Sequence, residues 1–317
     1  MARKDLPDCL GDRFTTADAI AAGVSRSRLR SGDLTHPFRG VHERNDLDDP
    51  FERMRGEFEA EHLRRALAYA RCMGDHVFFS HVTAAVIWGV PLPLWVLVDA
   101  PIHVAVVAPA RLPRAKGVRG HQTTKRLARV MTDPTFGLRV ASPATTWAMS
   151  ASYLTNLADV VAVGDAIVRT WRVDEPLATL DQLAAATTAG RRVGINRLRI
   201  ALGSVRMRSA SRPETHQRLL LISAGFGEPQ LNYEIYDEDG NYLGAADTAY
   251  PERLVSIEYE GDHHRTDPEQ WARDIRRYAA MRDAGWTIVN VTRDDLFGHP
   301  ERLVTTVRRA LASRADT

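Results

Sequence analysis

The sequence predicts a multidomain protein that combines α+β and α/β structure. Its 317 residues are enough for two or three domains of ordinary size. Apolar residues make up 44% of the chain and charged residues 26%, as in folded globular proteins and unlike disordered or fibrous ones. Short helices and a hairpin pattern open the chain, whereas strands and helices alternate in its last third. The predicted parts are 1–49, 50–175, a connector at 176–209, and 210–317.

Cysteine usage and hydropathy exclude several classes of protein. Cys9 and Cys72 have no paired spacing, which excludes a cysteine-based zinc site and fits a reducing compartment. The first residues contain no apolar leader, and the most apolar stretch, 90–107, is interrupted by prolines and an aspartate, so it cannot span a bilayer. We therefore expect a cytoplasmic protein with no membrane partner.

The charges are distributed unevenly along the chain. The net charge is +2, but residues 1–212 carry a balance of +9 and the remaining residues a balance of −7. The stretch 182–212, which overlaps the predicted basic helical connector, contains seven arginines and no acidic residue. Such a segment is typical of phosphate contact, although GC-rich coding would also favour arginine over lysine. The connector residues expected to contact DNA are Arg191 and Arg192.

Residues 14–44 show the pattern of a compact winged helix-turn-helix. A first helix is predicted over 17–22, a second from Ser25 to near Gly32, and a two-stranded wing over 34–43. In this fold the second helix enters a DNA groove. The alternative is a small packing or dimerisation unit with a solvated basic face. The arginines expected to contact DNA are Arg26, Arg28 and Arg30.

The segment 50–175 is predicted to be a domain of mixed structure. Apolar residues at helical spacing predict a helix over 50–73 and another near 81–88. Strands are predicted at 102–108 and 138–141. Three histidines of this segment are scattered along the sequence with no carboxylate at ligand spacing, which favours core or surface histidines over metal ligands. They are His81, His103 and His121.

Three stretches of this first half resemble one known family. The sequences FTTADAIAAGVSRSRLRSGDLTHPFRGVH, FFSHVTAAVIWGV and LRVASPATTWAMSAS resemble the AbiEi-type antitoxins, which are transcriptional regulators of abortive-infection toxin–antitoxin pairs. The resemblance covers about residues 10–175. It implies a winged helix that binds operator DNA, a middle domain that contacts DNA or a partner such as a cognate toxin, and no chemistry.

From residue 210 onward the pattern predicts one domain with the element order αβββαβα. Ser211 and Pro213 open its first helix, which Gly225 ends. An Asp-Gly turn joins the first two strands into a hairpin. The predicted elements are a helix over 211–222, strands over 231–236, 242–247 and 253–260, a helix from 267 to 285, a strand over 286–291 and a helix over 300–312.

Acidic residues occupy alternate positions of the third predicted strand. Glu258 and Glu260 share one face of this strand, and Asp247 ends the neighbouring strand across a tight connection. Acids this close repel one another and lose hydration unless a cation lies between them. Because oxygen ligands favour Mg²⁺ or Mn²⁺ over zinc, we expect these three acids to bind one of these ions. The alternative is that they face solvent and pair with arginines.

The same segments resemble a family of nucleases. Asp247 followed by Glu258-Tyr259-Glu260, in the order αβββαβα, is similar to the PD-(D/E)XK core of restriction-endonuclease-like proteins. The stretches AADTAYPERLVSIEYEGDHHR, DIRRYAAMRDAGWTIVNVT and PERLVTTVRRAL resemble the branch related to very-short-patch-repair endonucleases. The resemblance implies a metal-dependent DNA phosphodiesterase in which Asp247 and Glu258 bind the metal and Glu214 is a catalytic acid from the leading helix. Without this resemblance, Glu214 would be interpreted as an acid that stabilises a helix N-terminus.

The chain also departs from this family. Glu260 occupies the place of the usual lysine, so it must bind metal or orient a water. The repair branch uses histidines nearby, and this resemblance assigns proton transfer or leaving-group contact to His264. Asn290 stands where the branch usually has an arginine, which weakens phosphate binding and is consistent with a degenerate nuclease. Asp274 and Arg277 share one helix face, where they either reach the site or pair with each other.

Together these features predict a DNA-binding protein with a Mg²⁺- or Mn²⁺-dependent endonuclease domain. The metal would activate the attacking water, and the basic N-terminal parts would neutralise phosphates that the acidic core repels. The expected partner is double-stranded DNA, in a nucleoid-associated setting of phage defence or DNA repair, with a cognate toxin or a second copy of the chain as a further partner. The alternative is a non-enzymatic, antitoxin-like transcriptional regulator with a degenerate nuclease fold.

Overall fold

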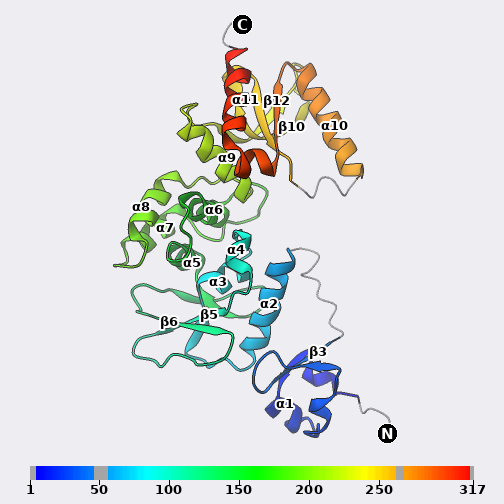
Figure 1. Ribbon diagram of the computed structural model, residues 1–317, viewed down its shortest axis with the longest axis vertical. Coiled ribbons are helices and arrows are strands. Elements are labelled where there is room, and N and C mark those ends of the chain that lie inside the picture. Colours follow the sequence, from blue (N-terminus) through cyan, green and yellow to red (C-terminus); the bar gives the residue numbers. More distant parts are fainter. Residues whose placement is uncertain (1–4, 46–55, 262–267, 315–317) are drawn as a thin grey trace. The chain divides into compact units, whose positions relative to one another are not determined.

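The computed structural model describes residues 5–45, 56–261 and 268–314, in the last range with side chains from residue 273 onward. Helices and several β-sheets alternate through these residues, so the chain has the mixed, multidomain α and β structure that the sequence predicts (Figure 1). Within the described ranges, none of the helices combines the length and the apolar composition needed to cross a membrane.

Spatial contacts divide the chain into two compact units. The first unit contains Met1–Tyr153 and Asp181–Ile195, and the second contains Leu154–Leu180 and Asn196–Thr317. The segment that begins at Leu154 therefore packs with the C-terminal part of the chain, whereas the sequence pattern placed most of it in the middle domain.

The N-terminal region of the first unit surrounds a small apolar core that includes Phe14, Leu29 and Leu34. Its sheet has the strand order β1-β3-β2. Helix α1 begins with a capping box, in which the side chains of Thr15 and Asp18 each accept a hydrogen bond from the other residue's backbone N–H. The elements are η1 (Asp8–Leu10), β1 (Arg13–Thr15), α1 (Thr16–Ala21), η2 (Arg28–Arg30), β2 (Leu34–Thr35) and β3 (Val41–Arg44).

The predicted second helix of this region is a short 3-10 helix, η2, and no longer helix forms within 25–32. The Ser25 hydroxyl accepts a hydrogen bond from the Arg28 backbone N–H (3.3 Å). The Arg28 guanidinium makes a bidentate ion pair with Asp33 (2.9 and 2.7 Å). Local side-chain bonds of this kind compete with a continuous helix. The predicted wing corresponds to β2 and β3, which pair antiparallel.

The rest of the first unit is built on a mixed sheet with the strand order β6-β5-β4-β8-β7. Strand β5 is almost entirely buried and pairs antiparallel with β4 and parallel with β6, while α2 and α3 pack against it. The strands β4, β6 and β7 were not predicted. The elements are α2 (Glu57–Ala70), β4 (Val77–Phe79), α3 (His81–Ile87), α4 (Leu94–Leu97), β5 (Ile102–Val107), β6 (Val118–Thr123), β7 (Val130–Thr132), β8 (Arg139–Ala141), α5 (Pro143–Ser150) and α7 (Leu180–Thr188).

The second unit contains a sheet with the strand order β12-β11-β10-β9. Strands β9, β10 and β11 are antiparallel neighbours, and β12 runs parallel to β11. From α9 to α11 the helices and strands follow the order αβββαβα that the sequence indicates. The elements are α6 (Leu157–Val168), α8 (Ile195–Ser204), α9 (Arg212–Ser223), β9 (Gln230–Tyr236), β10 (Tyr242–Tyr250), η3 (Pro251–Arg253), β11 (Val255–Tyr259), α10 (Pro268–Asp283), β12 (Thr287–Val291), the π-helical turn η5 (Asp294–Gly298) and α11 (Pro300–Ala312).

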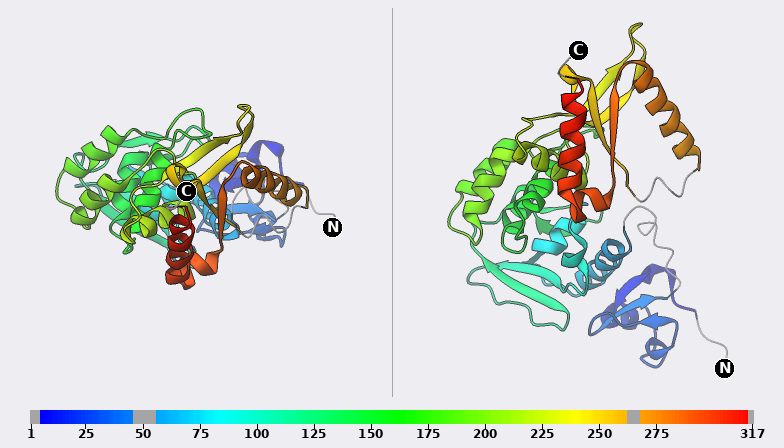
Figure 2. Two further views of the ribbon diagram at one scale, coloured as in Figure 1. Left: turned by 90° about the horizontal axis from the view of Figure 1, so that it is seen from above. Right: turned by 45° about the horizontal axis from the view of Figure 1, so that its top comes forward.

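Helices cover both faces of this sheet. Figure 2 shows α10 and α11 on opposite faces. On one face Met281 packs with Trp286 and residues of β9 and β10. On the other face Leu221 of α9 and Val307 of α11 pack with apolar residues of β11 and β12. Strand β11 therefore lies in the middle of a three-layer arrangement.

Helix α6 holds α9 through buried charges. Arg218 of α9 is fully buried, and its guanidinium lies 2.9 Å from a carboxylate oxygen of Asp165. The carboxylate of Asp159 is 2.7 Å from both Arg212 and His216. Burying a charged group without a partner is strongly unfavourable, so these pairs make α6 part of the structure that supports α9.

Candidate functional site

Two of the acids that the sequence suggests as metal ligands lie on adjacent strands. Thr248 of β10 is opposite Ile257 of β11, so the next residues along the two antiparallel strands, Asp247 and Glu258, are also opposite one another. Asp247 Oδ2 accepts a hydrogen bond from the backbone N–H of Tyr259 (2.9 Å), which holds the Asp247 carboxylate beside β11. The tight connection between the strands therefore brings the two acids together.

Glu214, in the first turn of α9, is a third acid and is only 6% exposed. Its Oε2 accepts hydrogen bonds from the backbone N–H of Ala210 (2.8 Å) and from the side-chain amide of Asn232 (3.2 Å). Ser211 caps the helix by accepting a hydrogen bond from the Glu214 backbone N–H. These contacts fix the carboxyl group at the start of α9, and α9 packs against β10.

The charge of Asp247 acts on both other acids. Burial raises the pKa of Glu258, and the charge of Asp247 raises it further, whereas Arg277 lowers it. Burial also raises the pKa of Glu214, with Asp247 as the next cause. Glu258 is 1% exposed, so little water is available to stabilise its charged form. Glu214, Asp247 and Glu258 therefore form one electrostatic group, which we call the acidic cluster.

Helix α10 supplies a cation and a phenol beside the acidic cluster. The Arg277 NH2 atom lies 3.6 Å from Glu258 Oε2 and 3.7 Å from Asp274 Oδ1. The Tyr278 hydroxyl donates a hydrogen bond to Glu260 Oε1 (3.3 Å). Arg277 thus both reaches the acidic cluster and pairs with Asp274, while Glu260 lies just beyond β11 and is tied to α10.

The donor atoms of the acidic cluster suit a hard divalent cation. Glu258 Oε1 is buried and has no hydrogen-bond partner among the described residues. Asp247 and Glu214 contribute further carboxylate oxygens, and Mg²⁺ and Mn²⁺ prefer oxygen ligands. A bound cation would also offset the repulsion between these acids. The residues that could hold such an ion are therefore Asp247, Glu258 and Glu214, with Glu260 nearby.

Gln217 belongs to this site but was missed in the sequence. Its Nε2 donates hydrogen bonds to the Thr248 hydroxyl (3.0 Å) and to the Ile257 carbonyl (3.1 Å), so it links β10 to β11 next to the acidic cluster. Its Oε1 is buried and lacks a hydrogen-bond partner within the described part of the chain. The sequence could have indicated Gln217, because it follows Glu214 by three residues and so lies on the same side of a helix.

The sequence also suggested His264 as a catalytic residue and Asn290 at the place of an arginine. His264 lies outside the described residues. Asn290 of β12 is opposite Glu258 in the parallel pair and is exposed. Asn290 is uncharged and supplies no cation to Glu258. Among the ion pairs of the described residues, Arg277 provides that cation.

The arginines expected to contact DNA fall into two groups. Arg26, Arg30 and Arg191 are exposed. Arg28 forms the bidentate pair with Asp33, and Arg192 is half-buried, donates to the Leu127 carbonyl (3.2 Å) and has a pKa lowered by burial. The guanidinium groups of the second group therefore have structural contacts that binding to phosphate would have to replace.

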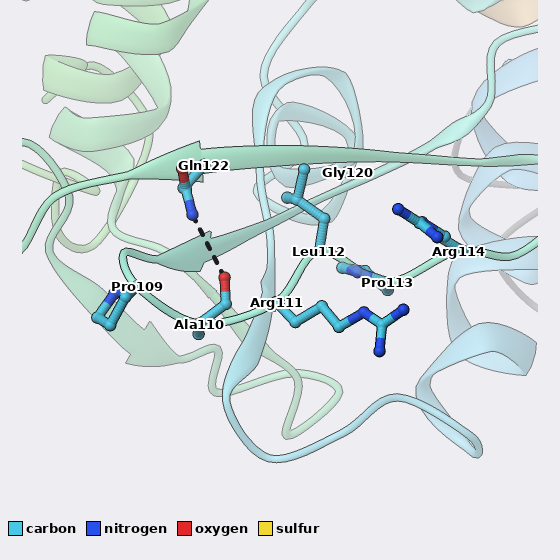
Figure 3. Close-up of a pocket in the computed structure, with 8 residues that line it drawn as sticks. All are labelled: Pro109, Ala110, Arg111, Leu112, Pro113, Arg114, Gly120 and Gln122. Carbon is cyan, nitrogen blue, oxygen red and sulfur yellow. Dashed lines mark hydrogen bonds between the residues drawn. The ribbon is translucent and has the colours of Figure 1, made fainter.

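A basic surface of the first unit was not anticipated from the sequence. Figure 3 shows a pocket between the loop 109–114 and strand β6, with Arg111 and Arg114 on its border. An adjacent pocket shares Arg114 and extends to residues from the N-terminal region. The visible signal was the run RLPRAK at 111–116. We define the basic surface by the cationic residues of these pockets, Arg39, Arg65, Arg111, Arg114 and Lys116.

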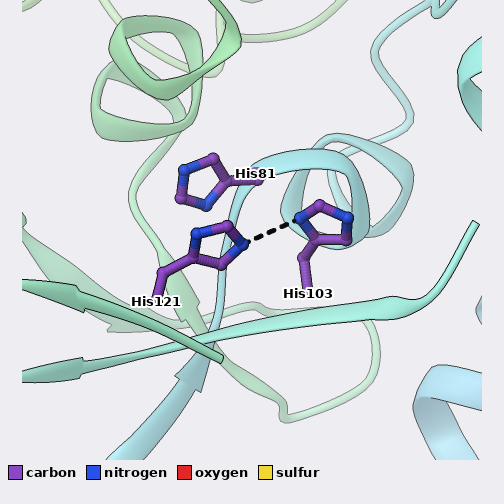
Figure 4. A group of neighbouring side chains, drawn as sticks. All are labelled: His81, His103 and His121. Atoms are coloured by element: carbon purple, nitrogen blue, oxygen red, sulfur yellow. Dashed lines mark hydrogen bonds between the residues drawn. The ribbon is translucent and has the colours of Figure 1, made fainter. Parts of the chain in front are cut away.

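His81, His103 and His121, although far apart in the sequence, lie close together in the structure. Each of the three rings has a nitrogen that lies within 4.8 Å of a nitrogen of each of the other two rings. Figure 4 shows the three side chains together. His121 is paired with Ala105 in the β5–β6 register, so His103 and His121 are diagonal neighbours on one face of the sheet. His81 joins them because the residue before it, Ser80, donates its backbone N–H to the His103 carbonyl (3.0 Å). Strand register, which spacing along the sequence does not reveal, assembles the group.

Two proteins of Mycobacterium tuberculosis are similar to this chain. They are the uncharacterized protein MT2308 of strain CDC 1551 / Oshkosh and the uncharacterized protein Rv2248 of strain ATCC 25618 / H37Rv. Each is 29% identical over 255 residues, which cover 80% of this chain and 88% of the relative. No protein-family profile matches the chain, and no solved structure matches it.

Proposed function

We propose that the C-terminal domain, 210–317, is a Mg²⁺- or Mn²⁺-dependent endonuclease that hydrolyses DNA phosphodiester bonds. The observation that carries the proposal is the acidic cluster, in which three carboxyl groups from α9, β10 and β11 act on one another. Further support comes from the element order αβββαβα and from the resemblance of these segments to the PD-(D/E)XK core.

In this proposal Asp247 and Glu258 hold the metal ion, and the bare Oε1 of Glu258 is an available ligand atom. An ion held there would supply Lewis-acid chemistry, polarising the scissile phosphate and lowering the pKa of the attacking water. The N–H of Tyr259 keeps the Asp247 carboxylate oriented, and the Ala210 N–H does the same for Glu214. Glu260 either adds a ligand or orients a water, as the sequence suggests.

Nucleases of the PD-(D/E)XK type usually have a lysine where this chain has Glu260. In this proposal Arg277 supplies the missing positive charge. Its guanidinium lies 3.6 Å from Glu258 and is partly accessible, with 27% of its side chain exposed. A guanidinium binds phosphate oxygens through two parallel hydrogen bonds. We infer that bound DNA draws Arg277 from the Glu258 carboxylate to the scissile phosphate.

The first unit binds the duplex in this proposal. The acidic cluster repels phosphates, so the affinity for DNA must come from cationic residues elsewhere. The basic surface is the strongest candidate, together with the exposed Arg26, Arg30 and Arg191. A protein of this kind would act on double-stranded DNA in the cytoplasm, close to the nucleoid, in phage defence or DNA repair.

The decisive experiment is nicking of supercoiled plasmid DNA by the full chain with Mg²⁺ or Mn²⁺ and with a chelator. We expect metal-dependent nicking that Asp247→Asn and Glu258→Gln reduce at least about 100-fold, while binding to uncut duplex is retained. Asp283→Asn, which changes an exposed acid of the same unit, is the matched control. Absence of nicking by the unaltered chain under every metal condition would refute the endonuclease.

One contact favours a second candidate function, a non-enzymatic antitoxin-like regulator with a degenerate nuclease fold. Arg277 already pairs with Glu258, so the protein itself supplies a cation to the acidic cluster. The regulator would bind an operator duplex and a cognate toxin or a second copy of the chain. Sequence-specific duplex binding without any metal-dependent nicking would support it, and loss of such binding would argue against both functions.

A further inference from the structure

We propose that His81, His103 and His121 bind a divalent transition metal of the zinc class, with a coordination position left for a fourth ligand. The site lies within the first unit and is independent of the acidic cluster. Its nitrogens come from the start of α3, from β5 and from β6, and one atom of each ring lies within 4.8 Å of the others. Figure 4 shows the three rings facing one another.

The spacing of the nitrogens is close to that of a metal site. Tetrahedral zinc holds imidazole nitrogens at about 2.0–2.1 Å, which places two such nitrogens roughly 3.3 Å apart. His121 Nε2 and His103 Nδ1 are 3.0 Å apart and share a hydrogen bond, so the proton between them must move to another ring nitrogen when both atoms bind a metal. The ring of His81 lies with its centroid 3.8 Å from that of His121. These two rings are stacked with their planes inclined by 21°, so the His81 ring must turn for its nitrogen to be directed at the same ion.

The rings are in the protonation state that binds metals. Burial is the largest cause that lowers the pKa of His103 to about 3 and that of His81 to about 2, and the positive charges of His121 and Arg119 contribute to both shifts. The neutral imidazole, which these shifts favour, is the form that ligates a metal. Metal binding therefore requires no loss of a proton from a charged histidine near neutral pH.

Neighbouring groups orient the ligands. His81 Nδ1 lies 3.0 Å from the Ser80 hydroxyl, an outer contact that leaves Nε2 for the metal. His81 also has a backbone φ of 49°, a left-handed conformation that is uncommon for a residue with a side chain and that clusters at functional sites. The ring of Tyr153 is 6.3 Å from that of His81, and its buried hydroxyl has no hydrogen-bond partner among the described residues. A water bound to the metal would give this hydroxyl a hydrogen-bond partner.

The chemistry of the donors selects the metal. Imidazole suits zinc, copper and nickel, whereas magnesium prefers oxygen. Catalytic zinc sites typically have three protein ligands and one open position, whereas structural zinc sites have four protein ligands. Arg119 and Arg192 act electrostatically on His81. Because these two positive charges oppose a bare cation, they favour an anionic fourth ligand such as hydroxide.

The test is titration of the metal-free full chain with Zn²⁺ by calorimetry. We expect one Zn²⁺ per chain at the histidines, with affinity reduced at least about 100-fold in the double variant His81→Asn/His121→Gln. Asparagine is chosen because it tolerates the left-handed backbone at 81. His76→Gln, which changes an exposed histidine of the same unit, is the control. Unchanged affinity in the double variant would overturn the site, as would absence of Zn²⁺ binding by the unaltered chain.

Cobalt separates this site from the acidic cluster. Co²⁺ in a tetrahedral site with nitrogen ligands absorbs visible light much more strongly than Co²⁺ among six oxygens. We expect this absorption in the unaltered chain and in Asp247→Asn, and its loss in His121→Gln. If the double variant fails to fold, as judged by circular dichroism, His121→Gln alone carries the test, since His121 is only partly buried. A weak, octahedral-type spectrum in the unaltered chain would refute the proposal and leave the nuclease question unaffected.

Discussion

At the scale of single residues, Glu258 shows how burial and charge combine in the acidic cluster. Asp247 and burial both favour the protonated form of Glu258, and Arg277 favours the charged form. Its Oε1 has no hydrogen-bond partner among the described residues. Because these effects do not cancel, a proton, a guanidinium or a metal ion must stabilise this carboxyl group, and the conditions decide which of them does.

The first prediction concerns the response of stability to metal. Mg²⁺ or Mn²⁺ should raise the melting temperature of the unaltered chain, because an ion that binds only the native state stabilises it. Asp247→Asn should abolish this rise and increase the metal-free melting temperature by roughly 2–4 °C, since it removes the charge that disfavours ionisation of Glu214 and Glu258. Calorimetry with and without metal measures both effects, with Asp283→Asn as control. A metal response that survives in Asp247→Asn would place the ion elsewhere.

The second prediction concerns pH. Glu214 and Glu258 have native pKa values raised above their ordinary value of 4.5. The native state therefore binds more protons than the unfolded state above that pH, so the free energy of unfolding should fall as the pH rises from about 5 to 8. Each proton contributes a slope of up to about 1.4 kcal/mol per pH unit. Urea unfolding of the metal-free chain at a series of pH values measures it, and Glu258→Gln should reduce the slope. A slope that stays the same in this variant would mean that Glu258 does not hold the proton.

At the scale of elements, α9 is the helix on which the acidic cluster depends. It provides Glu214 and Gln217 on the side of the strands, and Arg218 on the side of α6. Asp165 of α6 accepts hydrogen bonds from Arg218 (2.9 Å) and from the Thr215 hydroxyl (2.7 Å). The position of Glu214 is therefore set in part by a helix that lies some fifty residues earlier in the sequence.

The third prediction tests this support. Asp165→Ala leaves the buried guanidinium of Arg218 with only its longer ion pair to Glu228 (3.8 Å), so it should reduce the free energy of unfolding by about 3–5 kcal/mol. Glu301→Gln, which alters an exposed acid on α11, should change it by less than about 0.5 kcal/mol. Urea denaturation measures both variants. Similar stability of the two variants would show that α6 does not support α9 through this pair.

At the scale of the whole molecule, the charge imbalance of the sequence follows the two units only in part. The basic stretch 182–212 is divided between them, with Arg191 and Arg192 in the first unit and its other five arginines in the second. The basic surface belongs to the first unit, and the acidic cluster belongs to the second. A protein that binds DNA through one unit and cleaves it with the other would divide affinity and chemistry in this way. A change in the salt dependence of binding caused by variants of the basic surface therefore reports on the first unit.

The fourth prediction concerns that salt dependence. Each phosphate contact contributes about −0.9 to the slope of log affinity against log salt concentration. The triple variant Arg111→Ala/Arg114→Ala/Lys116→Ala should make the slope less steep by up to about 2.7. A control variant, Arg302→Ala/Arg309→Ala on α11, should leave it unchanged. Fluorescence anisotropy with a labelled duplex measures the slopes, and equal slopes for the unaltered chain and the triple variant would remove the basic surface from the interface.

The sequence by itself determined what depends on local order. A strand was predicted over 253–260, and β11 forms there with Val255 and Ile257 fully buried. The capping position Ser211 marked the start of α9. The order αβββαβα and the uneven charge were readable for the same reason: periodicity, caps and composition involve residues a few positions apart. The roles of the DNA-contacting arginines and of the metal ligands stay predictions.

The tertiary structure decided which distant groups meet. His81, His103 and His121 are brought together by the register of β5 with β6 and by the bond from Ser80 to His103. Arg218 meets Asp165 only because α6 packs on α9. The second N-terminal helix is replaced by η2, with local bonds of Ser25 and Asp33. Strand register and helix packing are set by the burial of many side chains at once, so spacing along one sequence cannot reveal them.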